Sequence, residues 1–198
     1  ALEELAAHAS IPVINALSEL YHPCQALADF FTLEERFGKL QGLTLAYVGD
    51  GNNVCHSLLL AGASVGANVR VATPAGYEPD AAIVAEALRA ARETRAKIEI
   101  LRAPEEAVAG AQAVYTDVWA SMGQEQEAAE REKLFAPYQV NEALMAQAAP
   151  EGVFLHCLPA HRGLEVTDAV MDAPSSIVYD QAENRLHVQK AILLTLLG

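Results

Sequence analysis

The sequence is poor in cysteine and in basic residues. Its three cysteines, Cys24, Cys55 and Cys157, are an odd number without CxxC spacing, which indicates neither a disulfide framework nor a thiolate zinc site. Lysine and arginine total 13 against 26 acidic residues, a net charge of −13, whereas a protein that binds nucleic acid normally presents a basic surface. We therefore expect a reducing, cytoplasmic setting and no nucleic-acid partner.

Long apolar runs are also missing. The longest charge-free stretch, residues 51–69, is broken by polar and glycine residues, and no apolar run reaches the roughly 18 residues of a membrane span, so we expect no membrane partner. The chain begins at Ala1 with an acidic helical pattern instead of a signal peptide and without Met, which suggests a fragment or a processed chain. Apolar residues still make up 52%, enough for the core of one large domain.

Short apolar segments alternate with helical patterns along the chain. The segments expected to be strands are residues 11–15, 43–49, 68–73, 97–101, 113–119, 152–158 and 176–179. Helical patterns cover residues 23–37, 53–66, 79–94, 104–110, 140–148 and 183–197. This alternation predicts an α/β fold, a doubly wound, Rossmann-like parallel sheet with helices on both faces. Ligands of such sheets bind beyond the carboxyl ends of the strands, here near residues 50–56, 117–125 and 156–163.

One long region lacks a clear pattern. Residues 121–137 are rich in Glu and Gln and follow directly after a predicted strand. Because loops of this length in compact domains are usually functional or mobile, we expect residues 121–137 to form a lid over the site.

The segment Gly49-Asp50-Gly51-Asn52-Asn53 lies after a strand and before a helix, as a dinucleotide-binding turn does. The nicotinamide fingerprint requires a third glycine where Val54 stands, and an acidic residue at the end of the next strand, which reads Val71-Ala72-Thr73. Nicotinamide binding is therefore disfavoured. Asn53, at the helix start, could instead bind a zwitterionic group, although asparagine is also a common turn residue.

Two further strand ends carry polar residues. Asp117 could pair with a ligand ammonium, and the Ser121-Met122-Gly123 turn offers a hydroxyl and amides suited to a carboxylate. Cys157, in His156-Cys157-Leu158-Pro159, is either an inert thiol or a site residue. The histidines near Cys157 have no third ligand at useful spacing, so we expect no metal.

Polar residues at the starts of two helices are further candidates. His22 and Gln25 lie in the first turn of their helix, where free amides favour an anion and His22 could donate to a carbonyl oxygen. Arg185, near the start of the last helix, could bind a phosphate or carboxylate, or form an exposed ion pair with Glu183.

Five motifs occur in one order along the chain: Leu20-Tyr21-His22-Pro23-Cys24-Gln25, Gly49-Asp50-Gly51-Asn52-Asn53, Asp117 with Ser121-Met122-Gly123, His156-Cys157-Leu158-Pro159, and Ala182-Glu183-Asn184-Arg185. Together they closely resemble the ornithine carbamoyltransferases of the aspartate/ornithine carbamoyltransferase family. The Ser-Met-Gly loop and the cysteine of His-Cys-Leu-Pro separate this branch from the aspartate carbamoyltransferases, which carry proline at the cysteine position.

The resemblance implies transfer of a carbamoyl group from carbamoyl phosphate to the δ-amine of L-ornithine, giving L-citrulline and phosphate in arginine metabolism, with neither cofactor nor metal. It assigns catalytic roles to His22, Gln25, Cys157 and Arg185, with Cys157 orienting the δ-amine. Carbamoyl phosphate would be bound by His22, Pro23, Cys24, Gln25, Cys157, Leu158 and Arg185. Ornithine would be bound by Asn53, Asp117, Ser121 and Met122.

The resemblance also implies domain boundaries. Residues 1–40 would be the tail of the carbamoyl-phosphate-binding domain with the interdomain helix, residues 41–182 the ornithine-binding α/β domain, and residues 183–198 a C-terminal helix that packs back towards the N-terminal domain. The family's Ser-Thr-Arg-Thr phosphate loop does not occur here, so we expect the chain alone to be incomplete. The family also implies a homo-oligomer, a trimer.

Two other functions stay open. One is a carbamoyltransferase that acts on another amine such as putrescine, although Asp117 and Ser121-Met122 suit an α-amino-acid end that a diamine lacks. The other is a non-catalytic domain of transcarbamoylase ancestry, which the missing phosphate loop would fit.

Overall fold

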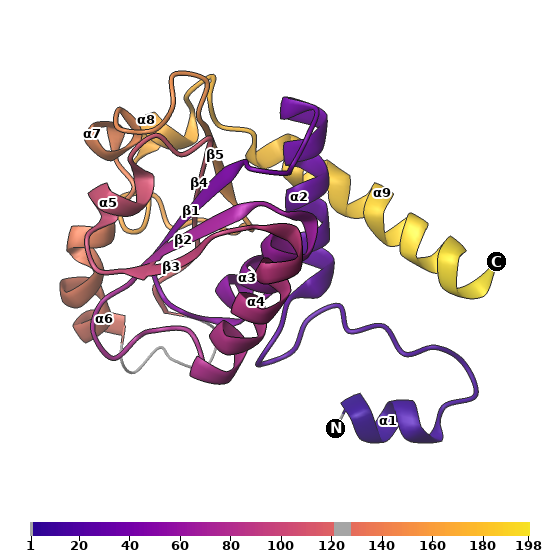
Figure 1. Cartoon of the computed structure of the whole chain (residues 1–198). Helices are drawn as coiled ribbons and strands as arrows, with labels where there is room; N and C mark the ends of the chain where they lie inside the picture. Colours follow the sequence, from indigo (N-terminus) through magenta and orange to yellow (C-terminus); the bar gives the residue numbers. More distant parts are fainter. Residues whose placement is uncertain (1, 121–127) are drawn as a thin grey trace.

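The computed structural model describes residues 2–120 and 128–198, and they contain a parallel sheet (Figure 1). Five strands lie in the order β3-β2-β1-β4-β5, and every neighbouring pair is parallel. Their bounds are β1 Thr44–Val48, β2 Asn68–Ala72, β3 Ile98–Leu101, β4 Ala113–Thr116 and β5 Val153–His156. The strand order reverses between β1 and β4, which makes the carboxyl ends of these strands the expected ligand crevice.

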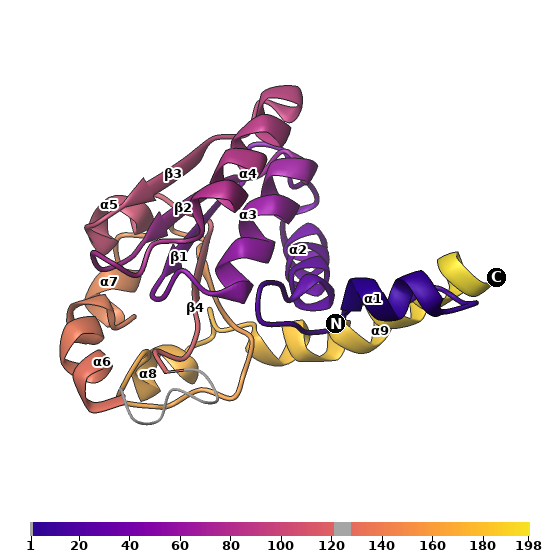
Figure 2. The same ribbon diagram turned by 90° about the horizontal axis from the view of Figure 1, so that it is seen from below.

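Helices cover both faces of the sheet, which confirms the predicted doubly wound α/β fold (Figures 1 and 2). On one face pack α2 Pro23–Phe37, α3 Asn53–Val65 and α4 Ala81–Thr94. On the other face lie α5 Pro104–Val108, α6 Ala128–Phe135, η2 Ala136–Tyr138, α7 Glu142–Met145 and α8 Asp168–Met171. The remaining helices are α1 Leu2–His8 and the long α9 Val178–Leu197, which packs along α2.

The strands β1, β4 and β5 are mostly apolar because both of their faces are covered. Every residue of β1, β4 and β5 is buried, which explains why these strands read as continuous apolar runs. The helix α2 has the predicted bounds: Pro23 occupies its first turn, and Gly38 ends it in the left-handed conformation with φ 75°.

Two predicted strands are wrong. Residues 11–15 belong to no helix or strand, and Ile11 is 69% exposed, so this apolar segment runs over the surface without a strand partner. Residues 176–179 contribute a single bridge, between Ser176 and Phe154, before α9 begins at Val178. Val178 is fully buried, so its apolar character reflects the packing of the first turn of α9. This helix begins five residues earlier than predicted.

The region predicted to be irregular is partly helical. Residues 121–127 lie outside the described residues, but α6 and η2 follow directly. Phe135 is fully buried and stacks on Trp119, so the second half of this region is fixed to the core.

The helix α9 extends beyond the sheet in Figure 1, and its last turns carry exposed leucines such as Leu194, 70% exposed, and Leu197, 62% exposed. Among the described helices, none combines the length and the apolar character that crossing a membrane requires.

Candidate active site

The turn between β1 and α3 is held by Asn52, the residue next to the predicted Asn53. Asn52 caps α3, since its Oδ1 accepts hydrogen bonds from the backbone of Val54 (3.0 Å) and Cys55 (3.2 Å). Its Nδ2 donates to Oδ2 of Asp117 at 2.7 Å. Asn53 Nδ2 donates to the backbone carbonyl of Ser18 at 2.7 Å, so in this structure Asn53 ties α3 to the segment before α2.

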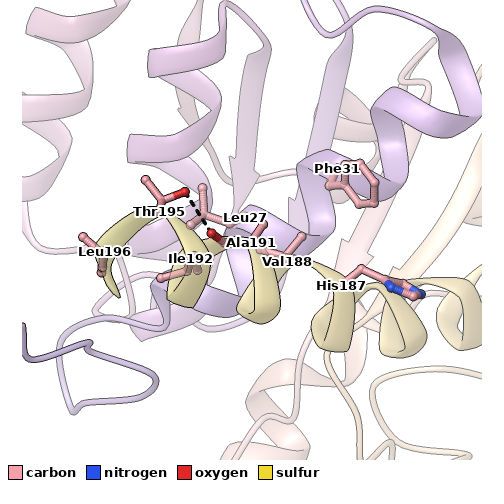
Figure 3. Close-up of a pocket in the computed structure, with 8 residues that line it drawn as sticks. All are labelled: Leu27, Phe31, His187, Val188, Ala191, Ile192, Thr195 and Leu196. Carbon is pink, nitrogen blue, oxygen red and sulfur yellow. Dashed lines mark hydrogen bonds between the residues drawn. The ribbon is translucent and has the colours of Figure 1, made fainter. Parts of the chain in front are cut away.

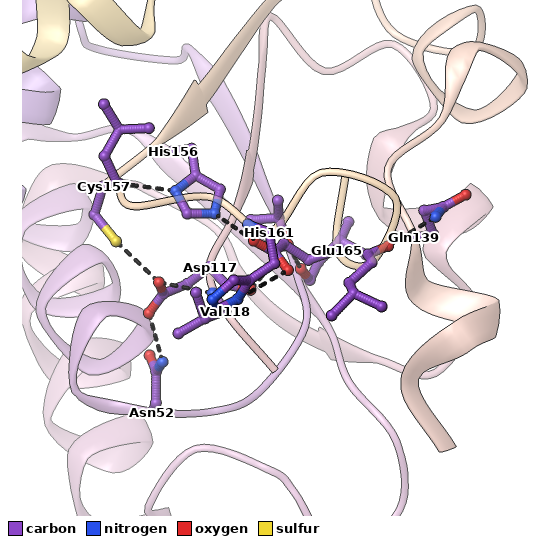
Figure 4. Close-up of polar contacts among 12 residues, drawn as sticks. Asn52, Asp117, Val118, Gln139, His156, Cys157, His161 and Glu165 are labelled. Atoms are coloured by element: carbon purple, nitrogen blue, oxygen red, sulfur yellow. Dashed lines mark hydrogen bonds and ion pairs between the residues drawn. The ribbon is translucent and has the colours of Figure 1, made fainter. Parts of the chain in front are cut away.

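Asp117 joins the ends of three strands through one carboxylate (Figure 4). It follows β4 and is only 6% exposed. While Oδ2 accepts from Asn52 of the β1–α3 turn, Oδ1 accepts from the Cys157 thiol after β5 at 2.9 Å and from the Val118 amide at 2.8 Å. The predicted residues Asp117 and Cys157 therefore lie side by side at the carboxyl edge of the sheet.

The Cys157 side chain is a thiol and not a thiolate at neutral pH. Burial, and then the negative charge of Asp117, raise its pKa well above the ordinary value. A protonated sulfur is a weak nucleophile but can donate its hydrogen to Asp117 and present its lone pairs to a neighbour.

His156 and Glu165 support the turn that carries Cys157. Because a backbone N–H can only donate, His156 Nδ1 accepts from Leu158 at 2.8 Å and its Nε2 faces Glu165 Oε1 at 3.3 Å. Both side chains are buried, and Glu165 Oε1 also accepts from the His161 amide at 2.5 Å. Leu158 has a left-handed φ of 59°, so the turn needs this support.

Asp117, His156 and Cys157 lie together as a metal site would have them, although their spacing did not suggest it. One potential ligand atom from each lies within 4.8 Å of the others. However, both nitrogens of His156 have partners within the chain, and Cys157 is a protonated thiol that donates to Asp117, whereas a cysteine that binds a metal is a thiolate. We therefore keep the prediction that no metal is needed.

The first turn of α2 brings His22 towards the sheet edge. Its backbone N–H donates to Ser57 Oγ of α3 at 2.8 Å, and its half-buried ring has an Nδ1 without a hydrogen-bond partner. Burial and the positive charge of Arg185 lower the His22 pKa, whereas a hydrogen bond to the Ala16 backbone and the charge of Asp117 act in the opposite direction. His22 therefore lies within electrostatic reach of both Arg185 and Asp117, as a neutral imidazole at pH 7.

Pro23 and Cys24, two other predicted residues of this turn, contribute to the local structure of α2. Pro23 begins α2, and Cys24 is buried, with its thiol directed at the Asn15 carbonyl oxygen at 3.6 Å. Leu158, on the opposite side of the edge, is half-buried in the turn after β5.

Arg185 of α9 contacts Gln25 of α2, so two motifs 160 residues apart meet. Its Nη1 donates to Gln25 Oε1. The alternative ion pair with Glu183 does not form, because the carboxylate of Glu183 faces His187 at 3.6 Å. Arg185 and Gln25 thus belong to one polar cluster.

Sequence reasoning missed an ion pair beside the β1 turn. Arg131 of α6 donates to Asp50 Oδ2 at 2.8 Å and to the Trp119 carbonyl oxygen at 2.7 Å, and its guanidinium lies 4.7 Å from the centre of the Tyr77 ring. The pair fixes the start of α6 next to the sheet edge. Ser121 and Met122, the two predicted residues of the adjoining segment, lie outside the described residues.

An apolar groove lies away from this edge, between α2 and α9, with a volume of about 450 Å³ (Figure 3). Leu27 and Phe31 line it from α2, and Val188 and Ile192 line it from α9. It offers few polar atoms, so the polar cluster at the sheet edge is the better candidate for chemistry.

Known proteins match this chain along almost its whole length. The family model described as "Aspartate/ornithine carbamoyltransferase, Asp/Orn binding domain" matches residues 41–196, and the model of the carbamoyl-P binding domain of the same family matches residues 1–35. The ornithine carbamoyltransferase of Thermococcus kodakarensis is 58% identical over 197 residues, which are 100% of this chain and 62% of the relative.

Solved structures are equally similar. Ornithine carbamoyltransferase from Pyrococcus furiosus has a TM-score of 0.95 at 57% identity, covering 98% of this chain and 62% of that one. An acetylornithine transcarbamylase complexed with acetylcitrulline has a TM-score of 0.89 at 35% identity, covering 100% of this chain and 62% of that one. The chain thus spans about 62% of the length of these relatives. One family model matches residues 41–196, which are most of this chain. The chain therefore belongs to the aspartate/ornithine carbamoyltransferase family.

Proposed function

We propose that this chain is the amine-binding part of an enzyme that transfers the carbamoyl group of carbamoyl phosphate to the δ-amine of L-ornithine, giving L-citrulline and phosphate. The observation that carries the proposal is the Asp117 carboxylate, 6% exposed and hydrogen-bonded to the Cys157 thiol. A nearly buried carboxylate at the ligand edge of the sheet is a counter-charge for the α-ammonium of an amino acid.

The chemistry requires a neutral amine and a polarised carbonyl group. The δ-nitrogen attacks the carbamoyl carbon, the new C–N bond forms, and the C–O bond to phosphate breaks. The nitrogen then loses a proton, which the departing phosphate accepts. Negative charge builds on the carbonyl oxygen, and in this proposal Arg185 and the neutral His22 donate to it. No covalent enzyme intermediate is needed, because much of the acceleration comes from holding the two substrates in line.

Cys157 orients the amine in this proposal. The thiol hydrogen is held by Asp117, so the sulfur lone pairs are free to accept a hydrogen from a neutral δ-amine. The high pKa of the thiol keeps this arrangement at neutral pH and argues against a carbamoyl-cysteine intermediate.

Replacing Cys157 by alanine should therefore impair ornithine use in the natural protein. We expect kcat/KM for ornithine to fall by an amount equivalent to about 2–4 kcal/mol, with the fold retained, because one positioned contact in a preorganised site is lost. Cys55→Ala is the matched control, since Cys55 is a fully buried thiol in the core of α3 and should change stability alone. Steady-state kinetics decide the matter. Unchanged ornithine kinetics in Cys157→Ala, or a trapped carbamoyl-cysteine in the parent, would contradict this role.

The rest of the carbamoyl-phosphate-binding domain would complete the site. We propose that residues 1–40 are the tail of that domain. The rest of the domain would cover the apolar groove between α2 and α9, and residues 183–198 would pack against the domain. Exposed Leu27, 47%, and Leu186, 63%, support such a contact, because apolar surface of this kind is usually covered. We also propose that the natural protein is a trimer, as its family implies, and that it is located in the cytoplasm.

The 198-residue chain on its own should show no transferase activity, since it lacks the Ser-Thr-Arg-Thr loop that binds phosphate in the family. Citrulline formation by this chain, measured beside the natural protein at its natural length, checks the expectation. Turnover by the chain within about tenfold of the natural protein would contradict it, because helix amides and Arg185 alone would then suffice to hold the phosphate.

The proposed substrate is tested with a panel of amines. The natural protein should form citrulline from L-ornithine and carbamoyl phosphate, and should use putrescine and N-acetylornithine poorly, because neither presents an α-ammonium to Asp117. Preference for putrescine or N-acetylornithine would replace the ornithine assignment. No turnover with any amine would favour a non-catalytic domain of the same ancestry.

A further inference from the structure

The carboxyl group of Asp29 lies in the centre of the α2–α9 contact and is fully buried. Its Oδ1 accepts two hydrogen bonds, from Gln25 Nε2 of α2 at 2.8 Å and from Gln181 Nε2 of α9 at 2.6 Å. A glutamine amide has a donor end and an acceptor end. Since Asp29 takes the donor end of both, each glutamine must turn its oxygen away from Asp29.

The two oxygens face two parts of the candidate active site. Gln25 Oε1 accepts from Arg185, and Gln181 Oε1 accepts from the backbone N–H of His156 at 3.0 Å, directly before Cys157. Gln181 is further held by the Tyr115 hydroxyl, 3.1 Å from its Nε2. One carboxyl group is therefore connected through one amide to Arg185 and through another to the Cys157 turn.

We propose that Asp29 is a positioning residue that sets the orientation of the Gln25 and Gln181 amides, and thereby aligns Arg185 with the Cys157 turn. Gln25 consequently offers an oxygen acceptor to the site, which suits the –NH₂ group of a carbamoyl ligand, a hydrogen-bond donor. The inference deepens the proposed function and rests on it.

The chemistry of the position supports this role. Burial raises the Asp29 pKa to about 7, against the opposing hydrogen bonds of Gln25, Gln181 and Tyr115 and the charge of Arg185. A fully buried carboxyl group lowers stability, so packing alone does not account for it. Both protonation states keep an acceptor oxygen for the two amides, whereas an apolar side chain has none.

Variants of the natural protein test the proposal. Asp29→Leu removes the acceptor at similar size, and Asp29→Asn keeps an acceptor oxygen. Gln181→Leu removes the link between Asp29 and His156 but leaves the link through Gln25 to Arg185 in place. Thr32→Val is the matched control, because Thr32 is buried in the same α2–α9 contact and its hydroxyl bonds the Ala28 carbonyl oxygen at 2.7 Å and the Asn184 amide at 3.0 Å. Steady-state kinetics with both substrates, thermal denaturation and a double-variant cycle with Gln25→Ala are measured.

Asp29→Leu should raise KM for carbamoyl phosphate and lower kcat, each by about tenfold or more, because misplaced site groups of this kind cost one to two orders of magnitude. Asp29→Asn should stay within about threefold of the parent, and Thr32→Val should change the melting temperature but neither constant. Gln181→Leu should raise KM for ornithine and leave KM for carbamoyl phosphate unchanged. In the Gln25→Ala background, the carbamoyl phosphate effect of Asp29→Leu should largely vanish, since both changes act through one amide.

Two results would overturn the inference: kinetics of Asp29→Leu equal to those of Thr32→Val, or no rescue by Asp29→Asn. If Asp29→Leu does not fold, the Gln181→Leu kinetics decide, and unchanged ornithine KM there contradicts the proposal. A parent that forms no citrulline refutes the proposed function itself, whereas an active parent with unaffected variants refutes only the positioning role.

Discussion

Asp117→Asn in the natural protein should lower kcat/KM for ornithine by about a hundredfold or more while leaving KM for carbamoyl phosphate within a few-fold. The substitution keeps the shape of the side chain but removes the counter-charge of the substrate ammonium. It also introduces an –NH₂ group where Asn52 Nδ2, the Cys157 thiol and the Val118 amide all donate to the carboxylate, so at least one donor loses its acceptor.

Kinetics with putrescine distinguish the loss of the counter-charge from the loss of a hydrogen-bond acceptor. Because it has no α-ammonium and no carboxylate, its poor turnover should fall much less than that of ornithine. Asp172→Asn is a suitable control, since Asp172 pairs with Arg162 on the surface and an exposed pair contributes little. Steady-state kinetics of parent and variants with both amines give the answer. Equal losses for ornithine and putrescine would make Asp117 a structural residue and remove the main physical support for ornithine.

Gly51→Ala should be among the most destabilising single substitutions in the chain. A Cβ at Gly51 would lie 2.2 Å from the Pro79 nitrogen, 2.5 Å from the Glu78 carbonyl carbon and 2.6 Å from the Tyr77 oxygen, all backbone atoms. Two backbone segments would have to separate, and the Gly51 N–H bond to Tyr77 at 2.9 Å would be lost. We expect the free energy of unfolding to fall by about 3 kcal/mol or more.

Denaturation by urea or heat measures this loss. Gly76→Asn is the control, because Gly76 has a left-handed φ of 86° that asparagine tolerates, and a Cβ added there would meet no described atom within 4 Å. It should cost about 1 kcal/mol or less. A Gly51→Ala protein as stable as Gly76→Asn would contradict the described approach of the two segments.

The fold could be predicted from the sequence where burial leaves a continuous pattern. The strands β1, β4 and β5 are covered on both faces, so they read as nearly continuous apolar runs. Residues 11–15 and 176–179 have the same apolar character for other reasons: one runs exposed over the surface and the other begins α9. Pattern alone does not show whether a partner strand exists.

The site was predictable only in part. That Asp117 and Cys157 meet follows from the parallel sheet, because carboxyl ends of neighbouring strands lie at one edge. Which asparagine bonds Asp117 depends on the capping geometry of α3, which favours Asn52. The Asp29–Gln181 bond spans 152 residues and requires the packing of α2 on α9, which no local pattern contains.

A crystal structure of the natural protein with a bisubstrate analogue, a phosphonoacetyl group joined to the δ-nitrogen of ornithine, would locate both substrates at once. We expect the α-ammonium of the analogue within hydrogen-bond distance of Asp117, its δ-nitrogen beside Cys157, and its acyl oxygen between His22 and Arg185. An analogue bound with its amino-acid end away from Asp117, or outside the carboxyl edge of the sheet, would contradict the proposed site.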